Sequence, residues 1–152
     1  MSKRIAQYKS GKENLYFFYR FIVLRWELEW TDQKFLLSVG ELQEFCYVHK
    51  ISLKSFDSTA KLNKALKEEF KSASDKYEGV IWFNKKDTKP KDVLRHLRNT
   101  FAHGNFSKRQ KNRINCIVFE NIDKKQIKAK GFIPLELIKP LITALETCKT
   151  DE

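Results

Sequence analysis

The chain has 152 residues, with 30 Lys and Arg against 19 Asp and Glu, and a formal net charge of +11 at pH 7. A hydrophobic fraction of 41% indicates a folded protein, and this length can bury a core without disulfides, so we expect one domain over residues 1–152. The three cysteines are far apart and form no CxxC pair, which argues against a disulfide framework or a zinc site. No segment is typical of a secretory signal or a membrane span, so we expect a cytoplasmic protein with no membrane partner.

The first half of the chain carries mainly helical patterns. Residues 14–30 are apolar almost all round, which predicts a helix surrounded by other elements. Apolar residues recur at helical spacing from 35 to 46, and again from Leu62 to about residue 73, so these segments predict two more helices. Residues 51–60 are polar and predict a connection, with Asp57 or Ser58 as the N-cap of the helix that follows. The segment GVIWF at 79–83 fits either a strand or the edge of a helix.

The second half adds two short strands. A charged loop at 84–92 leads into a helix that ends near His103, where Gly104 suits a left-handed C-terminal cap. Residues 114–119 and 126–132 predict two strands joined by a turn, with Cys116 as a small buried residue. Apolar residues from 135 to 145 predict a last helix. The pattern therefore predicts a mainly α fold, a helical bundle with a small β-hairpin before the C-terminal helix.

The helix that ends near His103 is amphipathic and lies in the most basic part of the chain. Residues 84–113 contain ten Lys or Arg against two Asp, and such a concentration of positive charge favours contacts with phosphates. At 100° per residue, Asn99 and His103 are neighbours on the polar face, and Arg98 lies at its border. The core side is expected to carry Leu94, Leu97 and Phe101.

Arg, Asn and His are residue types that metal-free RNA cleavage requires. The ribose 2′-hydroxyl must lose a proton as it attacks phosphorus, the leaving 5′-oxygen must gain one, and an imidazole can serve either step. An arginine can stabilise the charge that develops on the phosphorane. We therefore predict Arg98 and His103 as catalytic residues, with Asn99 orienting the imidazole or the ribose. The alternative is a surface arginine and a helix-terminal histidine that interacts with the helix dipole.

The stretch LRHLRNTFAHGNF at 94–106 resembles the signature of the HEPN superfamily (higher eukaryotes and prokaryotes nucleotide-binding). Arg98, Asn99 and His103 match its Arg–polar–spacer–His pattern, and size and layout are similar to those of small stand-alone bacterial and plasmid members. The resemblance implies a single HEPN-like domain that forms a homodimer with a composite active site. It also implies a metal-independent ribonuclease without a cofactor, which acts as a toxin or abortive-infection effector and leaves 2′,3′-cyclic phosphate and 5′-hydroxyl ends. An antitoxin protein is an expected partner.

The remaining basic residues and histidines complete the expectations. We expect RNA, as single strands or tRNA loops, to be held by further cations, namely Arg95, Lys108, Arg109, Lys111 and Arg113, although these side chains could equally be solvated. By the angular count we place His96 away from the polar cluster, and we expect it and His49 to be structural.

Two other functions remain open at this point. The first is a non-catalytic HEPN-like module that binds nucleic acid or a protein, because some members of the superfamily lack activity. The second is a basic DNA-binding regulator, although the sequence lacks a clear helix-turn-helix spacing.

Overall fold

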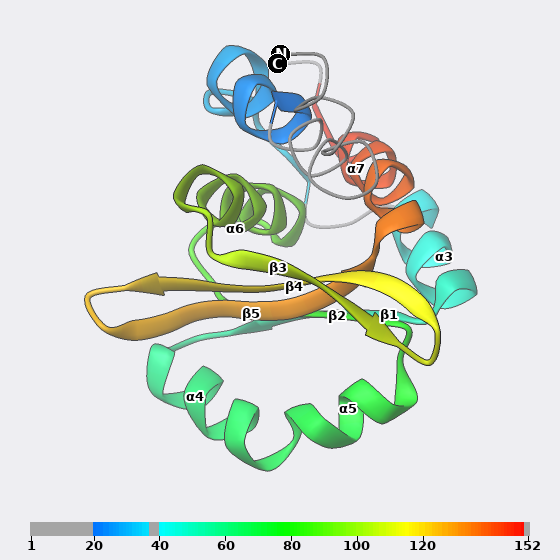
Figure 1. Ribbon diagram of the computed structural model, residues 1–152. Coiled ribbons are helices and arrows are strands. Elements are labelled where there is room, and N and C mark those ends of the chain that lie inside the picture. The colour runs from blue at the N-terminus through cyan, green and yellow to red at the C-terminus, as the bar shows by residue number, and fades with distance from the viewer. Residues whose placement is uncertain (1–19, 37–39, 151–152) are drawn as a thin grey trace, which may run out of the picture.

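The computed structural model describes residues 20–36 and 40–150. Its centre is a five-stranded mixed sheet with helices packed on both faces (Figure 1). The strand order is β1-β2-β5-β4-β3; β1 and β2 are parallel, and every other neighbouring pair is antiparallel. The strands are β1 (Ile51–Phe56), β2 (Gly79–Asn84), β3 (Phe106–Lys111), β4 (Ile114–Asp123) and β5 (Gln126–Pro134). The predicted mainly helical bundle is therefore wrong, and the fold is α/β.

The error arises from the three strands outside the predicted hairpin, none of which alternates apolar and polar residues over its whole length. β1 falls within the segment predicted as a connection, and β3 is an edge strand whose sequence FSKRQK is mostly basic and polar. β2 is the ambiguous GVIWF segment; its first five residues are all buried because helices cover both faces of the sheet there. The predicted hairpin is confirmed as β4 and β5, but both strands are longer, and only Lys124 and Lys125 form the turn, both with positive φ.

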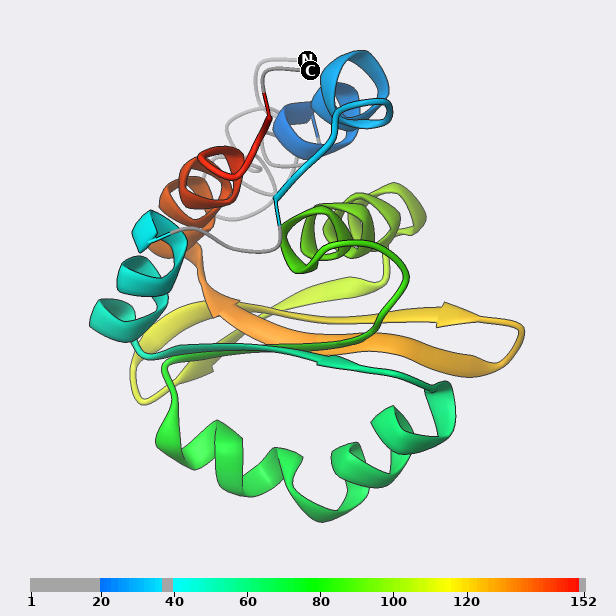
Figure 2. The same cartoon turned by 180° about the vertical axis from the view of Figure 1, so that it is seen from behind.

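One face of the sheet carries most of the helices and the larger part of the core. Here lie α6 (Lys89–His103), α7 (Ile138–Glu146), α3 (Gly40–His49) and the two short π-helical turns η1 (Arg20–Leu24) and η2 (Trp26–Trp30), with the 3-10 turn η3 (Leu135–Leu137) before α7. Figure 2 shows the same layer from behind. Apolar side chains of α6 and α7 pack on residues of β2, β4 and β5, among them Ile81, Phe83 and Ile117.

The opposite face of the sheet is covered by α4 (Thr59–Glu68) and α5 (Phe70–Lys76) (Figure 1). The single helix predicted from about 59 to 73 is divided at Glu69, and Ser58 caps its start by accepting a hydrogen bond from the backbone N–H of Lys61 at 3.1 Å. Leu62 packs there on Val80 and Trp82, which alternate along β2 with the residues of the other core. Cys116 of β4 is buried in the same cluster, as predicted.

The N-terminal expectations are met in part. Residues 14–19 of the predicted 14–30 helix lie outside the described residues, and the remainder forms the turns η1 and η2. Of the helix predicted from 35 to 46, the part from Gly40 onward is α3, whereas Phe35 forms an isolated antiparallel bridge with Lys149. Among the described residues, no helix is both long and apolar enough to cross a membrane.

Candidate functional site

The helix α6 forms as the sequence predicts and carries the residues of the motif in its C-terminal half. Pro90 occupies its first turn, and Gly104 ends it in the left-handed conformation at φ 70°, which a residue without Cβ adopts at little cost. Its apolar side packs into the core, with Leu94, Leu97 and Phe101 all buried. This packing fixes the direction in which the polar side of the helix points.

A cleft of about 390 Å³ lies between the polar side of α6 and the strands below it. Asn99 and His103 line this cleft together, and His103 is exposed at its edge. The opposite wall is formed by the end of β4 with the adjoining hairpin, and by the segment that follows β2. Asn99 and His103 are thus neighbours on α6, as predicted, and both face the cleft.

Arg98 lies beside this cleft and does not line it. Its Nη1 donates to Oδ1 of Asn99 at 2.9 Å, and its Nη2 donates to Oε1 of Glu27 in η2 at 2.5 Å. The ion pair is partly solvated, since the side chain of Glu27 is 50% exposed and that of Arg98 29% exposed. The structure therefore connects Arg98 to the cleft through Asn99, and gives it an acidic partner that the motif did not suggest.

His96 lies on the same side of α6 as Asn99 and His103, so its predicted placement away from them is wrong. The separation of His96 and His103 is seven residues, which is close to two helical turns and returns to one face. His96 is 1% exposed, and its Nδ1 lies 2.9 Å from Nδ2 of Asn121 on β4. Burial, and then the charge of Arg95, lower the pKa of His96 to about 4, so the imidazole is neutral near pH 7.

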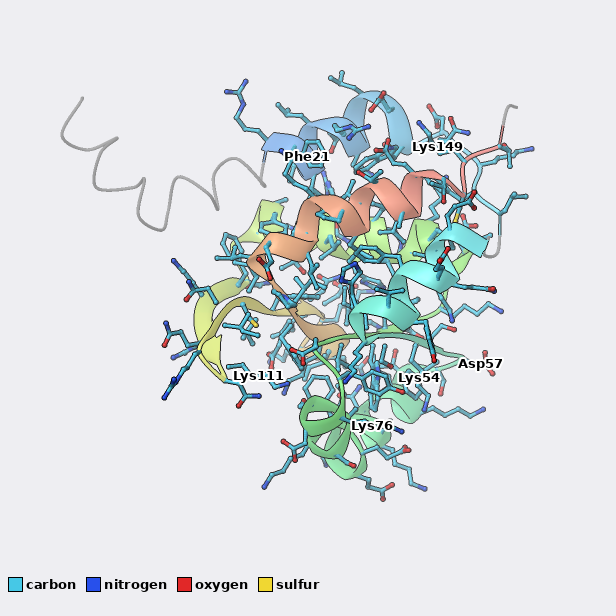
Figure 3. All side chains as sticks on the ribbon, turned by 90° about the vertical axis from the view of Figure 1, so that its right-hand side faces the viewer. Phe21, Lys54, Asp57, Lys76, Lys111 and Lys149 are labelled. Atoms are coloured by element: carbon cyan, nitrogen blue, oxygen red, sulfur yellow. The ribbon has the colours of Figure 1, made fainter. Side chains whose placement is uncertain are left out.

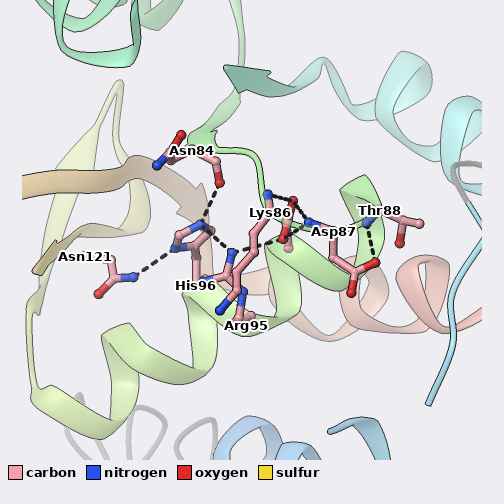
Figure 4. A network of polar contacts seen from close by, with 8 residues as sticks. Asn84, Lys86, Asp87, Thr88, Arg95, His96 and Asn121 are labelled. Atoms are coloured by element: carbon pink, nitrogen blue, oxygen red, sulfur yellow. Dashed lines mark hydrogen bonds and ion pairs between the residues drawn. The ribbon is translucent and has the colours of Figure 1, made fainter. Parts of the chain in front are cut away.

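The neutral ring of His96 has its two nitrogens in different roles. Nδ2 of Asn121 is a donor, so Nδ1 of His96 accepts from it, and the ring proton is on Nε2. Nε2 lies 3.4 Å from the backbone carbonyl oxygen of Asn84, to which it can donate, and also 3.4 Å from Nη2 of Arg95. The ring thereby joins the end of β2 to the end of β4 beneath α6 (Figure 4).

Arg95 also lines the cleft, and a buried carboxylate fixes its position. Its Nη2 donates to Oδ1 of Asp92 at 3.0 Å, and Asp92 is 0% exposed. The other hydrogen bonds of this carboxylate come from the backbone N–H groups of Lys86 and Asp87, at 2.9 to 3.0 Å (Figure 4). Asp92 therefore holds both the guanidinium of Arg95 and the loop that bears Lys86 at the cleft.

The other predicted RNA-binding residues are not gathered at the cleft. In β3, Lys108 pairs with Ile117 and lies on the α6 face, whereas Arg109 pairs with Cys116 and lies on the opposite face. Lys111, which is labelled in Figure 3, donates from Nζ to the backbone oxygen of Tyr77 at 2.9 Å and lies over the ring of Phe132. Arg113 is exposed in the β3–β4 turn with a φ of 68°. Their contact with RNA stays a prediction, but the sheet divides them between its two faces.

Other residues of the cleft were missed by the sequence-based reasoning. They come from the segment after β2 and from the β4–β5 hairpin, and their signal in the sequence was limited to charge and amide chemistry. These residues are Asn84, Lys85, Lys86, Asn121, Asp123 and Lys128. Among the described residues, no group of three His, Cys, Asp or Glu side chains is arranged to hold a metal ion.

Comparison with known families gives one match over almost the whole chain. A family described as HEPN pEK499 p136 matches residues 4–150. No curated protein and no solved structure matches the chain significantly.

Proposed function

The chain belongs to the HEPN pEK499 p136 family, and from this premise we propose that it is a metal-independent endoribonuclease of HEPN type. Membership supports a nucleotide-binding, ribonuclease-type protein in general terms. The observation that carries the finer proposal is the cleft itself, in which Asn99 and His103 lie together with Arg95 and the lysines that follow β2. A phosphodiester would enter a site that already contains an imidazole, an amide and several cations.

The reaction proposed is an internal transfer at phosphorus. The ribose 2′-hydroxyl loses its proton to a base and its oxygen forms a bond to the adjacent phosphorus, while the bond from phosphorus to the 5′-oxygen breaks and that oxygen takes up a proton. The products carry a 2′,3′-cyclic phosphate and a 5′-hydroxyl. His103 is the general base or acid, because its imidazole is exposed at the edge of the cleft.

Asn99 and Arg98 support this step in different ways. Asn99 lines the cleft and its Oδ1 already accepts from Nη1 of Arg98, so the amide Nδ2 is left to orient the imidazole or hold the ribose. The guanidinium of Arg98 stabilises charge on the phosphorane when substrate binds. To reach the phosphate it must release, or share its donors with, the carboxylate of Glu27.

We further propose that the active form is a homodimer. One imidazole cannot easily take a proton from the 2′-hydroxyl and supply one to the 5′-oxygen in the same step. Two copies of His103 in a composite site would divide these roles. Single-stranded RNA or tRNA loops are the proposed substrates, in a toxin or abortive-infection setting in the cytoplasm with an antitoxin protein as partner.

The test is RNA cleavage in the presence of EDTA by the wild type and by His103→Ala. We expect loss of a general acid or base to slow cleavage by roughly a hundredfold to ten-thousandfold. His49→Ala is the matched control, because His49 lies at the end of α3, where its ring packs on Phe45 outside the cleft. End-labelling of the products tests for the cyclic phosphate. Equal cleavage by the wild type and His103→Ala, or no cleavage of any RNA, would overturn the enzymatic proposal.

A non-catalytic RNA-binding module is the second candidate, and the pairing of Arg98 with Glu27 favours it. A guanidinium that is neutralised by a carboxylate is less available to stabilise a transition state. In that case the basic cleft would still hold RNA through its phosphates. Salt-dependent RNA binding by the wild type, without any cleavage products, would select this candidate.

A further inference from the structure

The inner end of the cleft has a floor and a charged wall that the catalytic motif does not account for. The floor is the hydrogen-bonded pair of His96 and Asn121, which are 1% and 6% exposed. The wall is formed by Arg95 and by the two lysines that follow β2, Lys85 and Lys86. A volume of about 390 Å³ is within the range of small-molecule sites. These features describe a cavity for a ligand that is anionic at one end and hydrogen-bonding at the other.

The charged wall is suited to a phosphate group. Within the described residues, neither Lys85 nor Lys86 has a hydrogen-bond or ion-pair partner for its ammonium group, and both side chains are exposed. Nη2 of Arg95 donates to the buried carboxylate of Asp92 and lies 3.4 Å from Nε2 of His96, so Nε and Nη1 are the donors left for a ligand. The single carboxylate among the lining residues is that of Asp123 on β4. The cations therefore outnumber the acid, and an anion is the favoured occupant.

The floor offers a fixed amide rather than a second charge. Nδ2 of Asn121 lies 2.9 Å from Nδ1 of His96, and Nε2 of the same ring lies 3.4 Å from both the carbonyl oxygen of Asn84 and Nη2 of Arg95. The contact with Nδ1 sets which end of the Asn121 amide is the donor and which is the acceptor. An asparagine amide with fixed orientation can pair with the adjacent donor and acceptor on the edge of a nucleobase, the adenine edge being the usual partner. A floor of this kind distinguishes bases, whereas the cations do not.

We propose that this cavity binds one nucleotide of RNA, with its phosphate on Lys85, Lys86 and Arg95 and its base against Asn121. The inference deepens the proposed ribonuclease function and rests on it for one point, that the bound nucleotide adjoins the bond that is cut, since Asn99 and His103 line the same cleft. Asn121 is then the residue that sets base preference, and His96 is a positioning residue that acts through it. Adenine is the preferred base.

The proposal is tested by binding, which does not require cleavage. AMP, GMP, CMP, UMP and inorganic phosphate are titrated into the His103→Ala protein by calorimetry and by amide NMR shifts. We expect AMP to bind most tightly and inorganic phosphate more weakly than any nucleotide. The double variant Lys85→Ala/Lys86→Ala should bind every nucleotide about tenfold more weakly, because it loses charge-assisted hydrogen bonds. The matched control is Lys67→Ala/Lys71→Ala, which removes two exposed cations from α4 and α5 on the other face of the sheet.

Asn121→Ala separates base recognition from phosphate binding. This variant should bind all four nucleotides with similar affinity, equal to the affinity that the protein with Asn121 has for nucleotides other than AMP. Its affinity for inorganic phosphate should be unchanged. If this variant does not fold, His96→Gln replaces it, with the same expected loss of base preference. A length series of adenosine oligonucleotides shows whether the site takes free nucleotides or nucleotides within RNA; tighter binding of a dinucleotide than of AMP supports the latter, and weaker binding overturns it.

The outcomes also distinguish this inference from the ribonuclease proposal. Nucleotide binding that depends on Lys85, Lys86 and Asn121, without cleavage of RNA, would support the nucleotide site and overturn the ribonuclease proposal. Cleavage that depends on His103, with no nucleotide binding or no effect of the cavity variants on binding, would overturn the nucleotide site and support the ribonuclease proposal. Equal affinity for inorganic phosphate and for all four nucleotides would overturn the contact with the base.

Discussion

Lowering the pH from 7 to 5 will destabilise the folded protein through His96. This side chain is 1% exposed, and its pKa is lowered to about 4, mainly by burial and then by the charge of Arg95. The hydrogen bond to the carbonyl of Asn84 and the charge of Asp92 act in the opposite direction but do not outweigh burial, and Lys86 lowers the pKa further. The folded protein thus keeps this imidazole neutral where an exposed histidine would take up a proton.

The sign and size of the effect follow from proton linkage. In the unfolded chain His96 titrates near its ordinary pKa of about 6.5, so the unfolded state binds more protons than the folded state between pH 6.5 and 4. Stability therefore falls as the pH drops through this window. The full shift corresponds to about 3 kcal/mol, of which about 2 kcal/mol is lost between pH 7 and pH 5.

The assay is urea unfolding at pH 7 and pH 5, followed by tryptophan fluorescence. In His96→Gln the side-chain amide can still donate to the carbonyl of Asn84 but does not titrate, so we expect its loss of stability between the two pH values to be smaller by about 2 kcal/mol. His103→Ala is the control and should keep the wild-type pH dependence, because it leaves His96 and the contacts of its ring in place. An equal loss in the wild type and in His96→Gln would refute the assignment of a buried neutral imidazole.

The remaining predictions concern the backbone and the pair of Arg98 with Glu27. Gly131→Ala should lower the free energy of unfolding by roughly 2 to 4 kcal/mol, because a Cβ there would lie 2.1 Å from a backbone oxygen of β2. Gly40→Ala, with nothing within 4 Å, should change it by less than about 0.5 kcal/mol, and urea unfolding of both variants tests the contrast. Gly104→Ala should lower the free energy of unfolding by about 1 kcal/mol, since a φ of 70° disfavours a residue with a Cβ. An unchanged midpoint of urea unfolding would contradict this. Glu27→Gln should lower the free energy of unfolding by less than about 1 kcal/mol, as expected for an exposed ion pair. The same variant should bind labelled RNA a fewfold more tightly in fluorescence anisotropy, because it frees the guanidinium of Arg98. Unchanged or weaker binding would mean that the carboxylate instead positions the arginine.

The part of the site that belongs to one helix was predictable from sequence. The apolar spacing of α6 and the adjacency of Asn99 and His103 follow from a period of 3.6 residues, and its end follows from the left-handed conformation that Gly104 adopts easily. The same period also places His96 on that face, so its predicted position was an error of counting and not a limit of the sequence. The partner of Arg98 was not predictable, because Glu27 lies 71 residues earlier in the chain.

The strands show where local pattern fails. β4 was recognised by its apolar run and β5 by its alternation of apolar and polar residues, and turn residues separate the two, whereas β3 is an edge strand and can be basic and polar on both faces. Its pairing with β4 is what separates Lys108 from Arg109. A basic run that looks continuous in the sequence is therefore divided, because successive side chains of a strand point to opposite faces of the sheet.

By itself, the sequence determined the amphipathic helix, the motif of Arg98, Asn99 and His103, and the family to which they point, since all of these depend on residues within one or two turns of each other. The tertiary structure alone decided that the motif faces a cleft with His96 and Asn121 at its floor and the lysines after β2 at its wall. The physical reason is that these residues meet only through the sheet: backbone pairing of β2 with β5, and of β5 with β4, brings the end of β2 beside the hairpin and beneath α6.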